Sequence, residues 1–232
     1  MPAIENFVEI EHVYAQTLGK GLRTLAVAAV NSGDGCSTLA YALARRHSAS
    51  GRQTLLVDMN LFRPSADIHF QLPRAAWSLD NGSSHSAIAE AGQNMQVLTA
   101  TLNSSIGFRD TGLIRKVIQD WESQVDAIVF DTSPLKAVNH QNIPAELICA
   151  ASQACILIVK SGATTEADLE HACHKLKSHD ARILGAVMND IENPGLAAEL
   201  KREISRLARR FPNFAARLRR WVQSSRFLNL PL

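Results

Sequence analysis

The sequence has no long apolar run and no recognisable leader. A helix that crosses a bilayer needs about 18–20 consecutive apolar residues, and no stretch of the chain approaches that length. Residues 1–6 provide neither a basic cluster nor the start of a long apolar segment, so a signal peptide is not indicated. We therefore expect a cytoplasmic protein.

Cysteine is scarce, and its spacing indicates neither a disulfide framework nor a zinc site. The four cysteines form no Cys-x-x-Cys pair, and in the cytoplasm we expect them to be reduced. His171, Cys173 and His174 lie close together, but their spacing fits no common zinc pattern. We predict no structural metal there.

The C-terminal part has no tyrosine and few acids. Nine Lys or Arg and a single acid, Glu203, lie between Lys201 and Arg226. Apolar residues recur every three or four positions, which predicts one helical stripe: Leu200, Ile204, Leu207, Phe211, Phe214, Leu218 and Trp221. The stripe either packs on the rest of the chain or contacts an anionic membrane surface or acidic partner. Nucleic acid is the least favoured partner.

Short apolar runs alternate with helix-length segments along the first 195 residues. Strands are predicted at 24–30, 54–58, 95–100, 126–131, 154–159 and 183–188, and helices at 5–19, 37–49, 110–123, 144–150 and 165–178. The polar residues 78–94 are expected to form a surface segment with a short helix. The alternation predicts an α/β fold with a mostly parallel sheet and helices on both faces, in three layers. We expect this domain to span 1–195, followed by a basic helical segment over 196–232.

Residues 30–38 have the outline of a phosphate-binding loop. An apolar strand leads into Gly33-Asp34-Gly35, and a predicted helix begins with Cys36-Ser37-Thr38. Glycines let the backbone approach a phosphate closely, and the N–H groups of a helix N-terminus point at it. Ser37 holds the position of a Mg²⁺ ligand, and Thr38 can face the α phosphate. The loop predicts a nucleotide site.

The loop lacks the lysine that normally follows its second glycine. Cys36 stands there, and a thiol has neither the length nor the charge to reach the β and γ phosphates. Two lost charge-assisted bonds weaken nucleotide binding by roughly two to four powers of ten. Lys136 or Lys160 could supply charge from elsewhere, although surface solvation is the more ordinary role. A nucleophilic role for Cys36 is a further alternative.

Two acids, Asp58 and Asp131, end predicted strands and are expected beside the loop. Each follows an apolar run, and the carboxyl ends of parallel strands meet at one edge of the sheet. Such acids can hold Mg²⁺ directly or through water. The alternative for either one is an ordinary helix cap.

Together these motifs resemble the deviant-Walker P-loop ATPases of the MinD/ParA class, and most closely the cytoplasmic domain of bacterial tyrosine kinases. That family reads Pro-Gly-Glu-Gly-Lys-Ser-Thr at 32–38, Asp-x-Asp-Leu-Arg-x-Pro at 58–64 and Ile-Asp-Thr-Pro-Pro at 130–134. The resemblance implies ATP or ADP with Mg²⁺ held by Ser37, Asp58 and Asp131. It also implies contact between Asn189 and the adenine, with a plain turn residue as the alternative.

Several departures from the family bear on function. Cys36 replaces the lysine, Asn31 and Ser32 offer no second lysine, and Asn60 replaces the second acid. The tyrosine-rich tail is missing, because the only tyrosines are Tyr14 and Tyr41.

These observations predict a degenerate kinase with weak or no ATP turnover, in which Asp58 is the one candidate catalytic residue. The resemblance places it in bacterial exopolysaccharide synthesis or export as an accessory component. It would act through protein partners at the inner membrane, and the class allows a homodimer. The alternatives are an active ATPase with a substitute cation and a tyrosine kinase that acts on a partner.

Overall fold

The computed structural model describes residues 7–103, 106–137, 142–190 and 204. The chain divides into two compact units, Met1–Asn189 and Asp190–Leu232. Only Asp190 and Ile204 of the second unit are described, and Ile204 is buried. The predicted basic segment at 196–232 therefore lies almost wholly outside the described residues, and its membrane and packing interpretations stay predictions.

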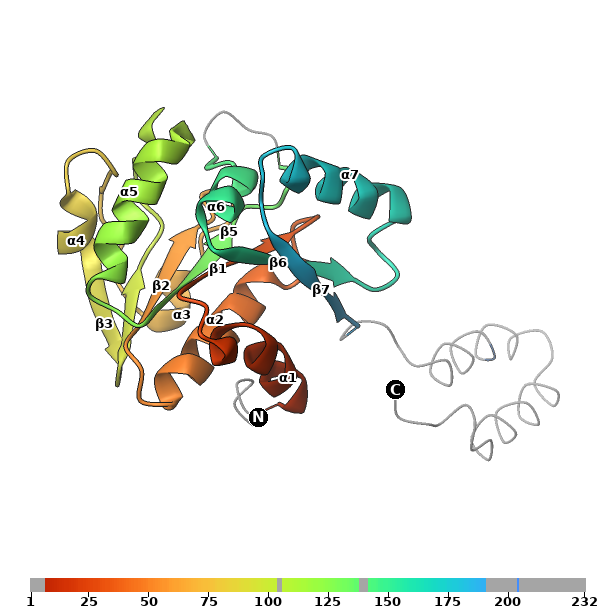
Figure 1. Ribbon diagram of the computed structural model, residues 1–232, viewed down its shortest axis with the longest axis horizontal. Coiled ribbons are helices and arrows are strands. Elements are labelled where there is room, and N and C mark those ends of the chain that lie inside the picture. The colour runs from red at the N-terminus through yellow and green to blue at the C-terminus, as the bar shows by residue number, and fades with distance from the viewer. Residues whose placement is uncertain (1–6, 104–105, 138–141, 191–203, 205–232) are drawn as a thin grey trace. The chain divides into compact units, whose positions relative to one another are not determined.

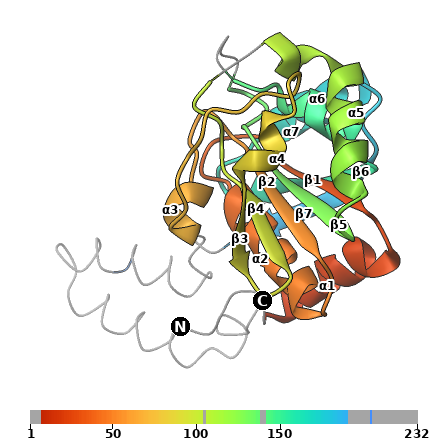
Figure 2. The same cartoon turned by 90° about the vertical axis from the view of Figure 1, so that its left-hand side faces the viewer.

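The first unit is built on a seven-stranded sheet in the order β3-β4-β2-β5-β1-β6-β7 (Figure 1). All neighbouring strands are parallel except β3, which runs antiparallel to β4 at the edge that faces the viewer in Figure 2. The strands are β1 (Thr24–Ala29), β2 (Thr54–Met59), β3 (Ile88–Gly92), β4 (Met95–Leu98), β5 (Ala127–Thr132), β6 (Ala154–Lys160) and β7 (Ile183–Asn189).

Helices cover both faces of the sheet, which confirms the predicted three-layer α/β fold (Figure 1). The helices α5, α6 and α7 pack on one face, and α1 and α2 on the other. The helices are α1 (Val8–Gln16), α2 (Cys36–Ala49), α3 (Ala66–Phe70), α4 (Ser83–Ala87), α5 (Thr111–Glu122), α6 (Ala145–Ala151) and α7 (Glu166–Lys177), with 3₁₀ turns η2 (Leu18–Lys20) and η3 (Ile106–Arg109).

The central strands are apolar throughout because they are buried on both sides. In β1, Leu25 and Val27 face the core beneath α1 and α2, whereas Ala26 and Ala28 face the core beneath α5, α6 and α7. Alternate side chains of a strand point to opposite faces, so a strand between two helical layers needs apolar residues at every position. This explains the continuous apolar run that the sequence shows.

The predicted strands and helices of the first unit are all present, with ends shifted by a few residues. Within residues 78–94, α4 is the short helix that the sequence indicated, and the structure adds β3. β3 lies at an edge of the sheet, is half-exposed and pairs irregularly near Gly92. Its Ile-Ala-Glu-Ala-Gly sequence lacks the run of β-branched residues that marks a strand.

Helix α1 is joined to α2 by one buried polar contact and one partly exposed ion pair. The Tyr14 hydroxyl lies 3.3 Å from Nδ1 of His47. Arg46 pairs with Glu11 and lies over the Tyr14 ring. No helix in the described part of the chain has the length and apolar character of a membrane span.

Replacing His47 by Gln should flatten the dependence of stability on pH. His47 is buried, and its Nε2 has no hydrogen-bond partner among the described residues. Burial lowers the pKa of His47 to about 4, so the folded state favours the neutral ring. The parent therefore loses stability as the pH falls from about 6.5 to 4, by about 2 kcal/mol between pH 7 and 5. Urea unfolding of both proteins measures the difference, and parallel pH profiles would contradict it.

Candidate functional site

The loop after β1 has the backbone of an anion-binding cradle. Gly33 and Gly35 adopt left-handed conformations, with φ of +90° and +108°, and α2 begins at Cys36. A Cβ at Gly33 would meet nothing within 4 Å, so the space above this glycine is open. The first N–H groups of α2 have no partner within the helix, and they can face an anion. The loop therefore has the shape that the sequence predicted.

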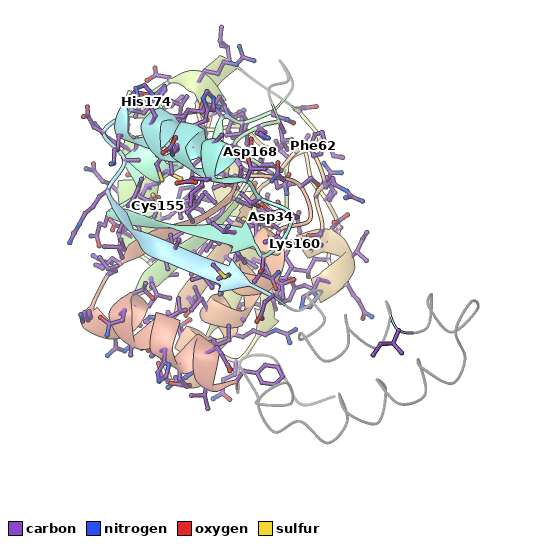
Figure 3. The ribbon with its side chains drawn as sticks, turned by 90° about the vertical axis from the view of Figure 1, so that its right-hand side faces the viewer. Asp34, Phe62, Cys155, Lys160, Asp168 and His174 are labelled. Carbon is purple, nitrogen blue, oxygen red and sulfur yellow. The ribbon has the colours of Figure 1, made fainter. Side chains whose placement is uncertain are left out.

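Two side chains hold this loop in place, one from the end of β7 and one from the segment that follows β6. The Asn189 amide, at the end of β7, donates to the Asp34 carbonyl at 2.8 Å. The buried Asp34 carboxylate accepts from the Asn31 N–H at 2.8 Å and from the Thr164 hydroxyl at 3.4 Å. In Figure 3, Asp34 lies at the same end of the sheet as Lys160, the last residue of β6. The loop is thus preorganised by residues 130 to 155 positions further along the chain.

Asn189 lies directly against the loop. A Cβ at Gly35 would come within 2.6 Å of its Nδ2 atom. The structure thus gives Asn189 a role in fixing the loop, a role that the sequence did not predict. Its contact with adenine stays a prediction.

The Cys36 side chain points beneath the loop, towards the sheet. Its Sγ lies 3.0 Å from the Val27 carbonyl oxygen and 3.7 Å from that of Thr132. Burial and the nearby Asp131 carboxylate raise the pKa of the Cys36 thiol well above its usual value. A protonated thiol that donates to carbonyls brings no charge to a phosphate and is a poor nucleophile.

Asp58 and Asp131 are register partners on the adjacent strands β2 and β5, and both are fully buried. Neither oxygen of Asp131 has a well-formed hydrogen bond among the described residues. Burial, followed by the charge of Asp58, raises the pKa of Asp131 to about 7, although the nearby Ser37, Cys36 and Tyr41 oppose the rise. The sheet therefore brings together two carboxyl groups, one of which lacks a partner in the described structure.

Asp58 is occupied by backbone groups. Its carboxylate accepts from the N–H groups of Asn60 at 2.9 Å and of Ser65 and Ala66 at 3.1 Å each. Burial raises its pKa, and these three bonds oppose the rise. The last two bonds cap the start of α3, so the helix-cap alternative from the sequence is realised. A bound cation could still reach this carboxylate through water.

A cavity of about 370 Å³ adjoins the first turn of α2. Ser37 and Thr38 line it, and Tyr41 lies deeper, with its hydroxyl 2.7 Å from that of Ser65. The rest of its lining comes from α2 and α3: Ala42, Arg45, Ile68 and His69. Thr38 is exposed and Ser37 is half-buried.

These residues fit a phosphate chain with Mg²⁺. The glycine backbone provides the cradle, and the unpartnered oxygens of Asp131 provide acceptors beside the Ser37 hydroxyl. No cluster of three or more His, Cys, Asp or Glu in the described ranges could hold a metal by itself. Mg²⁺ would therefore depend on Ser37, Asp58 and Asp131 together with phosphate oxygens and water.

Of the two lysines that the sequence suggested, Lys160 lies at the same end of the sheet as Asp34 (Figure 3). Lys136 is paired with Asp168 at 2.5 Å. Arg63, which no feature of the sequence singled out, also reaches the loop, with its Nη1 atom 3.4 Å from the Ser32 hydroxyl. Arg63 follows Asp58 by five residues, which is only a weak signal of this contact. The fold is needed to show that the segment after Asp58 meets the loop at Ser32.

Replacing Asp131 by Asn should stabilise the protein at alkaline pH. The folded state favours the protonated acid, so this residue lowers stability progressively from about pH 4 to 7, and fully above pH 7. We expect a gain of about 2 kcal/mol or more at pH 8 and little change at pH 4. Urea unfolding of the parent and the variant at both pH values measures this difference in stability. Asp120→Asn, on the exposed face of α5, is the control for loss of a charge. An equal effect of Asp131→Asn at both pH values would contradict the assignment.

A methyl group should disturb the loop far more at Gly35 than at Gly33. Both positions are left-handed, so Ala costs about 1–2 kcal/mol at either one. Gly35→Ala adds a clash with Asn189, whereas Gly33→Ala enters open space. Thermal unfolding should show the larger loss for Gly35→Ala. Equal losses would show that Asn189 does not pack on the loop.

Comparisons with known proteins bear on the family resemblance and on the fold. No protein-family model matches the chain. The tyrosine-protein kinase CpsD of Streptococcus pneumoniae is 25% identical over 185 residues, which cover 76% of this chain and 80% of CpsD.

Solved structures share the fold. The VpsO kinase domain superposes with a TM-score of 0.69 at 18% identity, over 79% of this chain and 93% of that domain. The septum site-determining protein MinD of Pyrococcus horikoshii, complexed with Mg-ADP, gives a TM-score of 0.60 at 17% identity, over 74% and 72% of the two chains. The comparisons confirm the resemblance predicted from the sequence, to P-loop ATPases of the MinD class and to bacterial tyrosine kinases in particular.

Proposed function

We propose that this protein is a kinase-like nucleotide-binding protein with weak or no ATP turnover. The observation that carries the proposal is the position of Cys36, whose thiol is buried beneath the loop and donates to the Val27 carbonyl. Phosphoryl transfer depends on fixed positive charge at the phosphates. A neutral side chain that points away from them cannot supply that charge.

The remaining cradle supports nucleotide binding of reduced strength. Gly33 faces open space, and Ser37 and Asp131 are the residues that we propose for Mg²⁺. The MinD structure with Mg-ADP has the same fold, which supports the choice of nucleotide. ATP or ADP with Mg²⁺ is therefore the ligand that we propose.

We further propose an accessory or regulatory role in bacterial exopolysaccharide synthesis or export, through protein partners at the inner membrane. The support is the sequence resemblance to the cytoplasmic domain of bacterial tyrosine kinases, together with the absence of tyrosines after Tyr41. A homodimer and contact of the basic segment with an anionic membrane belong to the same proposal.

A second candidate function is phosphorylation of tyrosines on a partner, with a substitute cation in place of the lysine. The similarity to CpsD favours it. Phosphotyrosine on a co-expressed partner, lost in an Asp131→Asn variant, would support this function over the first.

Restoring the lysine should restore the nucleotide site. Cys36→Lys places an ammonium group beside two buried carboxyl groups, which can accept it. We expect ATP affinity to rise roughly 100-fold or more and phosphate release to become measurable. Calorimetric titration and a phosphate-release assay provide the measurements.

Cys36→Ser is the matched control, because it keeps a small neutral donor and should leave affinity nearly unchanged. Turnover by the parent at about 1–100 s⁻¹, the usual range of kinases, would contradict the proposal. An unchanged affinity of Cys36→Lys would show that the missing lysine is not the limiting feature.

A further inference from the structure

We propose that Arg63 binds the terminal phosphates of the nucleotide and partly replaces the lysine missing at position 36. This inference rests on the proposed nucleotide site and names a specificity residue within it. Its basis is the contact between Arg63 Nη1 and the hydroxyl of Ser32, at 3.4 Å. Ser32 is exposed and lies at the start of the phosphate loop.

The backbone around Arg63 is fixed, although its side chain is exposed. The Asn60 Oδ1 atom accepts from the Arg63 N–H at 3.1 Å. The Asp58 carboxylate accepts from three further N–H groups of the same segment, at Asn60, Ser65 and Ala66. A buried acid and a buried amide thus hold a tight loop that presents the guanidinium to residues 31–35.

Arg63 keeps its charge available for a ligand. Within the described ranges its guanidinium forms no ion pair, and Ser32 is its hydrogen-bond partner. Two other cations near this end of the sheet are engaged, since Lys136 pairs with Asp168 at 2.5 Å and Lys175 with Glu146 at 3.2 Å. The neutral amide of Asn60 next to the segment does not cancel the charge, as a carboxylate there would.

The chemistry of arginine suits this position. A guanidinium is always charged and offers a planar set of donors that matches phosphate oxygens. It would approach the phosphate chain from the Ser32 side of the loop, whereas a lysine at position 36 would rise from the helix side. Arg63 should therefore strengthen binding of the outer phosphates and leave the contribution of the α phosphate unchanged.

The experiment is calorimetric titration of the full chain with ATP, ADP, AMP and inorganic tripolyphosphate. We expect Arg63→Ala to weaken ATP and tripolyphosphate about 10-fold or more, ADP less, and AMP not at all. Arg63→Lys should recover part of the loss, because it restores charge without the planar donors. Increasing the salt concentration should weaken the parent more than Arg63→Ala.

Arg52→Ala is the matched control. It removes the same charge from an exposed arginine that precedes β2, at the opposite end of that strand. It should change each dissociation constant less than twofold. Circular dichroism and thermal unfolding of every variant verify the fold.

The inference would be overturned by an unchanged ATP affinity in Arg63→Ala, by an equal loss for AMP, or by an equal loss in Arg52→Ala. A parent that binds neither ATP nor tripolyphosphate at millimolar concentration would also overturn it, while leaving low turnover intact. Rapid turnover by the parent would instead refute the proposed function and leave the role of Arg63 in binding unaffected.

Discussion

The site depends on two buried carboxyl groups that have no positive side chain between them among the residues that the structure describes. The parallel pairing of β2 with β5 sets Asp58 opposite Asp131, and both are inaccessible to water. The backbone N–H groups of Asn60, Ser65 and Ala66 compensate Asp58. Asp131 lacks such compensation, so its pKa rises to about 7. A buried acid can relieve an unfavourable charge by keeping its proton.

Cys36 links this electrostatic situation to function. A lysine at position 36 would compensate the charge of Asp131 and could contact the phosphates of a nucleotide. The Cys36 thiol is neutral and donates to the Val27 carbonyl, so it does neither. The rest of the loop has the geometry of an anion site, supported by Asn189 and Thr164. Under the proposed function, the chain separates two properties that usually occur together, namely the loop shape of a phosphate site and the positive charge that activates a phosphate.

Much of the fold followed from the sequence because the central strands are buried on both faces. Continuous apolar runs at β1, β5 and β6, separated by helix-length segments, are typical of a sheet between two helical layers. β3 escaped prediction since an edge strand needs no such run, and its pairing depends on β4. The strand-end acids were predicted correctly in position. The capping bonds of Asp58 could not be predicted, because they depend on where the loop before α3 folds back.

The contacts of Asn189 and Arg63 could not be predicted from the sequence. Asn189 meets Asp34 across 155 residues, and Arg63 meets Ser32 across 31. No periodicity or local motif encodes either contact, because each arises only when strand ends assemble at one edge of the sheet. The most direct test of the account is a pH titration of the Asp131 carboxyl carbon by ¹³C NMR in the nucleotide-free protein. Burial without a compensating charge predicts a midpoint near pH 7, and a midpoint below the ordinary value of 3.8 would show instead that a positive group compensates this acid.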